Sequence, residues 1–223
     1  MQIHDLSMPV DTGHFRWPIE RGKRGDFEQG SAFESTWMQT SCHGFTHMDA
    51  ACHMVPGGKT TSELELSRVV GRAAVIDLSD IEPMQQISAT LLAERAAHLK
   101  AGEIALFRSC WDEQRDWQTE AFWRDAPFMS QEACEWLLAA QPTAAAFDFP
   151  QDYTIRLLLD GEMRPIEEHV THHILLRNGI TLIEYLVNTR PVSGSHTFLC
   201  ALPIKLMASD GAPSRVIAVD QIG

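Results

Sequence analysis

The chain has 223 residues, 44% of them hydrophobic, and a formal net charge of −12 from 18 basic and 30 acidic side chains. This acidic balance argues against a nucleic-acid partner or an anionic membrane surface, and no apolar run is long enough to span a bilayer. We expect one domain, residues 1–223, with a sizeable core. Five cysteines without regular spacing predict free thiols, and the first residues lack a signal-peptide pattern, so we expect a cytoplasmic protein.

The predicted elements begin with a short strand at 2–7, followed by a long loop or arm from Met8 to Gly30 that is rich in Pro, Gly and charge. Phe15 and Trp17 lie on this arm. They either anchor the arm to its own domain, line a pocket, or cross to a partner subunit. A strand at 33–41 then leads into a histidine-rich stretch.

Beyond that stretch, strands alternate with helices, which predicts an α/β domain with a large mixed or antiparallel share. We expect helices at 89–99 and 131–140, capped by Ser88 and Ser130. A helical stretch within 165–178 should end at Asn178-Gly179. The remaining predictions are strands at 72–78, 103–108, 144–148, 180–184, 197–207 and 215–220, and a turn at Gly211-Ala212-Pro213.

The histidine-rich stretch, residues 42–53, is the strongest candidate for a site. It holds three histidines and an aspartate, where chance would put roughly half a histidine in eleven residues. His43, His47 and Asp49 lie at offsets 0, 4 and 6, which share one face of an extended strand. Two imidazoles and a carboxylate suit a divalent transition metal with room for water, and His53 could serve as a base beside it.

The alternative of a structural zinc site using Cys42 and Cys52 is less favoured, because the chain lacks a paired C-x-x-C pattern.

A second cluster follows, with His169, His172 and His173 within five residues and Glu184 twelve positions after His172. A helix end and the next strand can lie side by side, so His172 and Glu184 could point at one spot. A solvated helix face with an ordinary strand-edge charge is the alternative. Together, the two clusters offer enough ligands for one five-coordinate metal or for two metals that share Asp49.

The first cluster resembles the H-x-G-T-H-x-D-x-P-x-H motif of the metal-dependent cyclase/hydrolase family, which includes bacterial kynurenine formamidase and isatin hydrolase. His43, Thr46, His47, Asp49 and His53 match the motif, whereas Phe45 replaces its Gly and Ala51 its Pro. The resemblance covers nearly the whole chain. Its further segments are Asp5-Leu6-Ser7, Trp17-Pro18, Phe107-Arg108-Ser109-Cys110-Trp111, which is similar to an R-T-G-W segment, the run from His172 to Glu184, Ala201-Leu202-Pro203-Ile204-Lys205 and Asp210-Gly211-Ala212-Pro213.

This resemblance implies a swivelling β/β/α fold with a mixed sheet and flanking helices, assembled as a homo-oligomer, a dimer or a tetramer. It implies one or two zinc or manganese ions. By the resemblance, His43, His47 and Asp49 would bind the first metal, His172 and Glu184 would complete a second half-site, and His53 would be the acid/base.

The function implied is hydrolysis of an amide C–N bond in a small aryl formamide or cyclic amide, by hydroxide generated at the metal. The metal would stabilise the oxyanion, and His53 would pass a proton to the leaving nitrogen. Candidates for the substrate pocket are Trp17 and Phe45, with Phe15 and Phe149 as further aromatic candidates, each with an equally simple core interpretation. A metal-dependent cyclase, dehydratase or isomerase, and a non-catalytic metal-binding module, remain alternatives.

Overall fold

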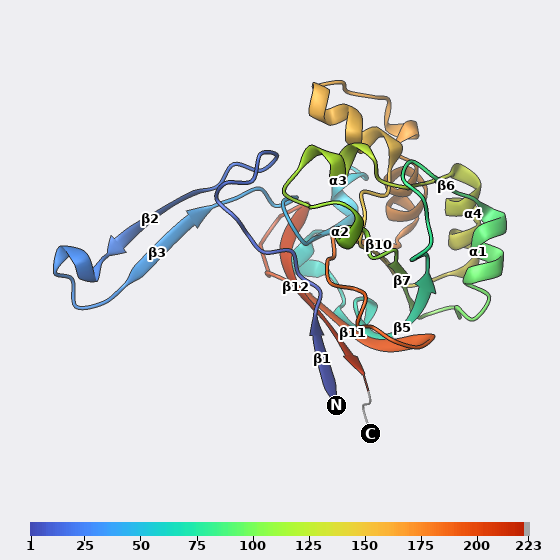
Figure 1. Cartoon of the computed structure of the whole chain (residues 1–223), viewed down its shortest axis with the longest axis horizontal. Coiled ribbons are helices and arrows are strands. Elements are labelled where there is room, and N and C mark those ends of the chain that lie inside the picture. The colour runs from blue at the N-terminus through green and yellow to red at the C-terminus, as the bar shows by residue number, and fades with distance from the viewer. Residues whose placement is uncertain (221–223) are drawn as a thin grey trace.

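The structure, a computed structural model, describes residues 1–220 and has a body built on one mixed β-sheet, from which a hairpin projects (Figure 1). The strands of the body sheet are β1 (Gln2–Asp5), β4 (His47–Asp49), β5 (Val70–Asp77), β7 (Ile104–Arg108), β9 (Ala144–Phe147), β10 (Thr181–Glu184), β11 (His196–Pro203) and β12 (Gly211–Asp220). The α-helices are α1 (Ala89–Arg95), α2 (Trp111–Gln114), α3 (Glu120–Arg124) and α4 (Gln131–Ala140). Two short strands, β6 (Gln86–Ile87) and β8 (Phe128–Met129), pair with each other.

The last strand closes the body sheet into a barrel. The strand order is β1-β12-β11-β5-β7-β9-β10-β4, and the start of β12 also pairs with β4. Strands β5, β7, β9 and β10 run parallel, whereas β4, β11 and β12 are antiparallel to their neighbours. Because β12 spans ten residues, it holds β11 and β1 and still reaches β4. The predicted mixed sheet is therefore confirmed.

Alternate side chains along the strands separate two apolar cores. Val75 and Leu106 pack with Met48 in a core that draws on every strand of the closed ring. Their chain neighbours Ile76 and Phe107 belong to a second core, which the helices cover. Successive residues of a strand point to opposite faces, so the nearly continuous apolar runs of β5 and β7 reflect burial on both faces.

The helical layer follows the predicted capping signals. The Ser88 hydroxyl accepts a hydrogen bond from Leu91 N at the start of α1, and the Ser130 hydroxyl accepts one from Ala133 N at the start of α4. The two helices pack against each other, and α4 also packs on a π-helical turn at Thr171–Leu175. Helix α4 has the predicted bounds, whereas α1 ends four residues earlier than expected.

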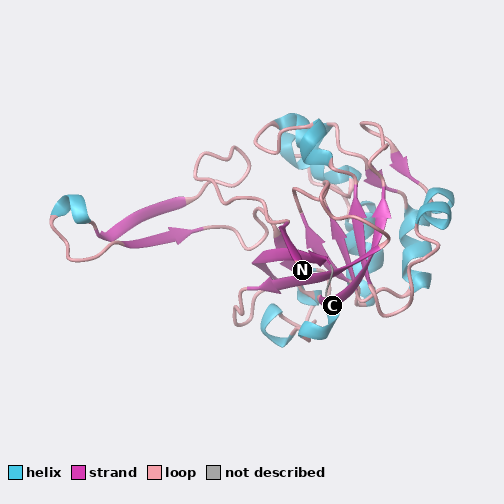
Figure 2. Cartoon of the chain, turned by 60° about the horizontal axis from the view of Figure 1, so that its bottom comes forward, coloured by secondary structure: helices cyan, strands magenta, loops and turns pink. Residues whose placement is uncertain are grey.

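The hairpin consists of β2 (Glu20–Gly25) and β3 (Ser35–Gln39), joined through a 3-10 turn at Phe27–Gln29. Figures 1 and 2 show it extending away from the body in both views. The prediction of a loop from Met8 to Gly30 is therefore wrong for its second half. Strand β2 has no apolar alternation, so its structure depends on pairing with β3, which a single-segment pattern does not reveal.

Other predictions need correction. Gly211-Ala212-Pro213, expected to be a turn, begins β12, because these residues pair with β4. Helices α2 and α3 and the 3-10 segment Tyr153–Asp160 were not predicted. The predicted domain runs to residue 223, and its last three residues lie outside the described part. Within residues 1–220, no helix is both long enough and apolar enough to cross a bilayer.

Candidate metal centre

Strand β4 provides the first half of the candidate site. Met48 packs into the barrel core, so His47 and Asp49 on either side of it point to the opposite face of the sheet. Strand β4 pairs antiparallel with β10 in a register that sets His47 opposite Glu184. One strand pairing thus brings an imidazole and two carboxylates together on the face that the helical layer covers.

The donor atoms of these three side chains converge. His47 Nε2 lies 3.3 Å from Asp49 Oδ1 and 3.4 Å from Glu184 Oε2. His47 Nδ1 donates a hydrogen bond of 2.9 Å to the carbonyl oxygen of Phe45, which directs Nε2 toward the carboxylates. His47, Asp49 and Glu184 are all buried. Two carboxylates buried side by side need a compensating positive charge or a metal ion.

His172 adds a second imidazole from the π-helical turn, a distortion that often occurs at functional sites. Its Nε2 lies 3.2 Å from Asp49 Oδ2 and 3.3 Å from Glu184 Oε1. Its Nδ1 donates a hydrogen bond of 2.6 Å to Asp152 Oδ2. Burial alone would lower the pKa of His172, but Glu184, Asp152 and Asp49 raise it well above its usual value. The predicted meeting of His172 and Glu184 therefore occurs.

His43 reaches the same place from a turn, because only 47–49 of the predicted extended stretch is a strand. Its Nδ1 donates a hydrogen bond of 2.8 Å to Asp49 Oδ1, and its Nε2 lies 3.1 Å from Asp210 Oδ2. Burial disfavours the charged ring, yet Asp49 and Asp210 raise the pKa of His43 to about 9. A Cβ atom on Gly211 would lie 2.7 Å from the His43 ring, so this approach requires glycine at 211.

His53 ends a short 3-10 turn, Ala51–His53, and lies at the edge of the cluster. Its ring centroid is 4.2 Å from that of His43 and 5.7 Å from that of His172. Its Nδ1 is 3.5 Å from Asp210 Oδ2. Burial lowers the pKa of His53 below its ordinary value, which favours the neutral ring at neutral pH.

The donor set fits a divalent cation. Within residues 1–220, two groups of side chains have donor atoms that all lie within 4.8 Å of one another: His43, Asp49 and His53, and His47, Asp49 and Glu184. Asp49 belongs to both groups. Burial would raise the pKa of Asp49, but hydrogen bonds from His172, His43 and His47 hold it well below its usual range. Carboxylate oxygens combined with imidazole nitrogens suit a transition metal.

Sulfur takes no part in either group. Cys42 and Cys52 instead have weak contacts with Ser209. His173 also lies apart, against Arg177, and the ring of His169 contacts the Thr154 hydroxyl. Of the three histidines of the second cluster, His172 is thus the one whose ring meets the carboxylates.

A cavity of about 470 Å³ opens beside the cluster. Its apolar wall is formed by Met54, Ile155, Leu158, Met163 and Ile166, with Tyr185 beside Glu184. Trp17 and Phe45, predicted to line the pocket, instead pack with each other in the core, at 5.0 Å between ring centroids, and Trp17 lies 5.5 Å from the ring of Tyr185. Phe149 is also in that core, and Phe15 is partly exposed. Apart from Tyr185, the large aromatic rings named here do not line the cavity.

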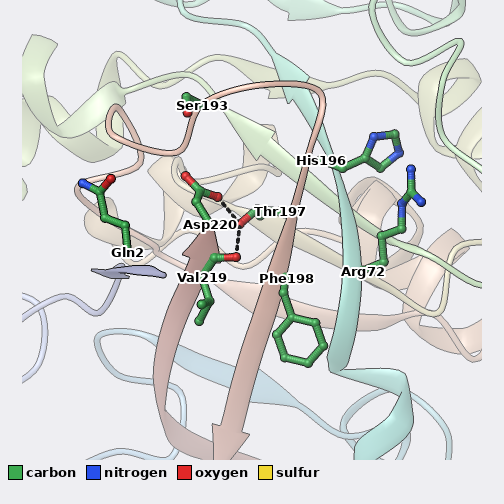
Figure 3. A pocket seen from close by; sticks show the side chains of 8 residues that line it. All are labelled: Gln2, Arg72, Ser193, His196, Thr197, Phe198, Val219 and Asp220. Atoms are coloured by element: carbon green, nitrogen blue, oxygen red, sulfur yellow. Dashed lines mark hydrogen bonds between the residues drawn. The ribbon is translucent and has the colours of Figure 1, made fainter. Parts of the chain in front are cut away.

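A second cavity, of about 530 Å³, lies between β1, β5, β11 and β12 (Figure 3). Its charged groups have partners within the chain. Arg72 pairs with Glu103 at 2.9 Å, and Asp220 accepts hydrogen bonds from Thr197 at 2.7 Å and from His4 at 3.2 Å. Neither candidate metal group of the described chain includes its residues.

Two residues that stand at glycine positions of the resembled motifs share an unusual backbone. Phe45 has φ of 56° and Cys110 has φ of 55°. Glycine adopts this left-handed region freely, whereas a bulky side chain there is strained. The side chain of Phe45 is buried, and Cys110 N donates a hydrogen bond of 2.8 Å to Asp148 Oδ2. Packing and hydrogen bonding therefore maintain both conformations.

Several residues near the site were not predicted: Arg16, Gln151, Asp152, Tyr185 and Asp210. Gln151 and Asp152 are adjacent, Tyr185 follows Glu184, and Asp210 begins one of the segments that carry the resemblance, but none of the five lies within either run of histidines. Gln151 donates to Glu184, and Asp152 also accepts hydrogen bonds from the backbone and hydroxyl of Thr171. A strand end at 144–148 was the one available signal for Gln151 and Asp152, since side chains after a strand end often reach a site at the sheet edge.

The fold and the cluster together define a class of protein: a mixed barrel with buried imidazoles and carboxylates arranged for a divalent cation beside a cavity. Residues 4–151 match the family model described as putative cyclase, so the chain belongs to this family.

Relatives and solved structures agree with this assignment. The chain is 28% identical to a kynurenine formamidase from Salinibacter ruber, over 99% of this chain and 98% of that one. It is 25% identical to a kynurenine formamidase from Bacillus cereus, over 96% of this chain and 95% of that one. It shares its fold with an isatin hydrolase bound to the product analogue thioisatinate, at a TM-score of 0.82 and 22% identity, over 97% of this chain and 91% of that one. The predicted swivelling β/β/α fold is thus confirmed.

Proposed function

We propose that this protein is a metal-dependent hydrolase that cleaves the amide C–N bond of a small aryl formamide or cyclic amide. The observation that carries this proposal is the convergence of His47, Asp49 and Glu184, whose donor atoms are buried together beside a cavity. The names of its relatives support hydrolysis over the alternatives of a cyclase, a dehydratase or a non-catalytic metal-binding module.

In this proposal His43, His47 and Asp49 bind a first metal ion, and His172 and Glu184 complete a second half-site that shares Asp49. The donor set of nitrogen and oxygen suits zinc or manganese, as one or two ions per chain. When bound, such an ion supplies Lewis acidity, which lowers the pKa of a coordinated water and polarises a carbonyl group.

The protein's own side chains then position groups and move a proton. Asp152 holds the Nδ1 proton of His172, so that Nε2 faces Asp49 and Glu184. Within residues 1–220, the ring of His53 forms no short hydrogen bond, and burial lowers its pKa. It is therefore neutral at neutral pH and able to accept a proton from the attacking water. It returns this proton to the leaving nitrogen, as a general acid.

The apolar wall of Met54, Ile155 and Leu158 gives an aryl ring a surface to pack on. A panel of N-formylkynurenine, isatin and cyclic imides, assayed with zinc and with manganese, tests the reaction class. Turnover of an amide with either metal is the expected result. No turnover across the panel by metal-loaded protein would contradict the proposal.

The assignment of Glu184 is tested by Glu184→Gln, which keeps the shape of the side chain and removes its charge. If Glu184 is a ligand, metal affinity and activity both fall steeply. The matched control is Glu113→Gln, at an exposed carboxylate paired with Arg190, where a change within about 0.5 kcal/mol of stability and unchanged activity are expected. If metal titration of Glu184→Gln gave the same affinity as the wild type, Glu184 would be excluded as a ligand.

We also propose that the chain forms a homo-oligomer, a dimer or a tetramer, through the β2–β3 hairpin. Phe27, Phe33, Trp37 and Met38 expose large apolar side chains on or beside it, and an isolated two-stranded hairpin is at best marginally stable in water. Light scattering should give a mass above that of the monomer. Trp37→Ser with Met38→Ser should lower that mass, whereas Met207→Ser, at an exposed methionine after β11, should not.

Finally, we propose that residues 1–223 act as one domain in the cytoplasm, with a small molecule as substrate. All five cysteines are free thiols, which suits a reducing compartment. Cell fractionation tests the location, and limited proteolysis that leaves one protected core tests the single domain.

A further inference from the structure

Arg16 is a cation without an anion in the cavity beside the metal centre. It lines that cavity together with His43, His47 and Glu184. Its Nη1 atom is buried and has no hydrogen-bond partner, and within residues 1–220 no carboxylate lies within ion-pair distance of its guanidinium. The Arg16 side chain as a whole is half-buried. In a chain with thirty acidic and eighteen basic residues, a buried guanidinium nitrogen without a partner is unexpected, because desolvating a charge without a partner is costly.

The aromatic surroundings of Arg16 do not satisfy its hydrogen-bonding groups. Its guanidinium carbon lies 4.5 Å from the ring centroid of Trp123 and 5.5 Å from that of Trp17. Stacking of this kind stabilises the cation through the ring faces. The N–H groups of a guanidinium lie in its plane, however, and form the fork that matches a carboxylate. Contacts with the ring faces therefore stabilise the charge and leave the guanidinium donors available.

The segment that carries Arg16 is held in place. Arg16 N donates a hydrogen bond of 3.2 Å to His14 Nδ1, and His14 Nε2 donates one of 3.1 Å to the carbonyl oxygen of Trp117. The His14 ring is buried and stacks on Trp17 and Trp117. A cation on such a fixed segment loses little conformational entropy when it binds a ligand.

The other arginine of the cavity shows the contrast. Arg164 also lines it, but its guanidinium forms hydrogen bonds of 2.9 Å with Glu162 and of 2.9 and 3.0 Å with Glu168. Its charge is therefore already compensated within the chain, and Arg16 provides the uncompensated one.

We propose that Arg16 binds a carboxylate on the substrate, so that the preferred substrates are anionic aryl amides whose carboxylate is separate from the amide that is cleaved. This inference rests on the proposed function for its account of turnover. The ligand cluster takes the amide, the apolar wall takes the ring, and Arg16 takes the carboxylate at a further point of the same cavity.

The test compares ortho-, meta- and para-formamidobenzoate with their methyl esters, which keep the shape and remove the charge. Wild-type protein should favour at least one acid over its ester by about ten- to hundredfold in kcat/KM, as for a charge-assisted hydrogen bond. Arg16→Met should remove this preference mainly through KM, with little change for the ester. Arg16→Lys should retain part of it, and Arg164→Met should retain all of it.

Binding to metal-stripped protein gives a readout that does not depend on turnover. Calorimetry should detect the preferred acid with wild-type and Arg164→Met protein, more weakly with Arg16→Lys, and at least tenfold more weakly with Arg16→Met. Circular dichroism shows which variants are folded. If Arg16→Met does not fold, the proposal is tested by the binding and kinetics of Arg16→Lys and by the ratio of kcat/KM for the acid to that for its ester in the wild type.

The outcomes separate the two proposals. Turnover of acids and esters at equal efficiency by the wild type would overturn the role of Arg16 and leave the hydrolase proposal intact. Absence of turnover for every formamide, together with acid binding that is lost in Arg16→Met, would reject the hydrolase proposal and retain Arg16 as a carboxylate-binding residue.

Discussion

The cavity beside β4 and the cavity of Figure 3 have similar volumes, about 470 and 530 Å³. They differ in how their charges are compensated. In the cavity between β1 and β11, Arg72 pairs with Glu103, and Asp220 accepts a hydrogen bond from Thr197. In the cavity beside β4, Asp49 is buried against His47 and Glu184 against His172. Within residues 1–220, no carboxylate lies at ion-pair distance from Arg16, whose Nη1 atom has no hydrogen-bond partner. The two cavities therefore differ in whether their charged groups have partners within the chain, and not in volume. This difference distinguishes the candidate active site.

Removal of metal gives the largest expected effect. Protein as purified should contain about one or two equivalents of a divalent ion, detectable by elemental analysis. A strong chelator should reduce activity to background, and added zinc or manganese should restore it. The metal should also raise the unfolding free energy, by about 2.7 kcal/mol at a hundredfold excess over Kd. Full activity in chelator, with no metal found, would contradict the assignment of the cluster.

The substitutions Asp49→Asn and Asp220→Asn make the same chemical change, from carboxylate to amide, in the two cavities, so their effects can be compared directly. Asp49 contacts three imidazoles, so its amide analogue should lower metal affinity by more than about a hundredfold, since even residues behind a ligand contribute ten- to hundredfold. Asp220→Asn removes a charge in the other cavity and should leave metal binding and kcat/KM unchanged. Isothermal titration and steady-state kinetics measure both. Equal effects of the two substitutions would remove the distinction.

His53→Ala should lower kcat by about 10² to 10⁴ while the protein still folds and binds its metal. Because burial lowers the pKa of His53, its imidazole should stay neutral, and able to act as a base, down to a lower pH than an ordinary histidine. The acidic limb of the pH–rate profile should therefore lie below neutral pH in the wild type. It should shift or disappear in His53→Ala. An identical limb in both proteins would assign it to the activated water instead. Loss of metal together with activity would make His53 a ligand.

Arg72→Gln in the cavity of Figure 3 should have the smallest effect. The Arg72 side chain is 61% exposed and pairs with Glu103, and exposed pairs contribute about 0 to 1 kcal/mol. For a chain of this length this corresponds to a decrease in Tm of at most about 4 °C, measured by calorimetry, with unchanged activity. A loss of activity as large as that of His53→Ala would show that this cavity takes part in catalysis.

Local pattern was enough for much of this protein. The offsets of His47 and Asp49 place both on one face of a strand, and Ser130 marks the start of α4 at the residue where it begins. The pairing of His172 with Glu184 was also predictable, because a short turn joins the helical segment to β10. These inferences depend on interactions between residues close in sequence, which the chain carries within each segment.

Only the tertiary structure decided the rest, because it depends on contacts between distant segments. The closure of β12 on β4 turned an expected turn at 211–213 into a strand and set Gly211 against His43. The aromatic rings of Trp17 and Phe45 were predicted to line the pocket, yet burial in the core satisfies large apolar side chains better than the cavity wall. Asp152 and Arg16 belong to no cluster in sequence. Their relation to the site arises from contacts between distant segments, of Asp152 with His172 and of Arg16 with Trp123. Such long-range juxtapositions follow from the whole fold, since no local preference encodes them.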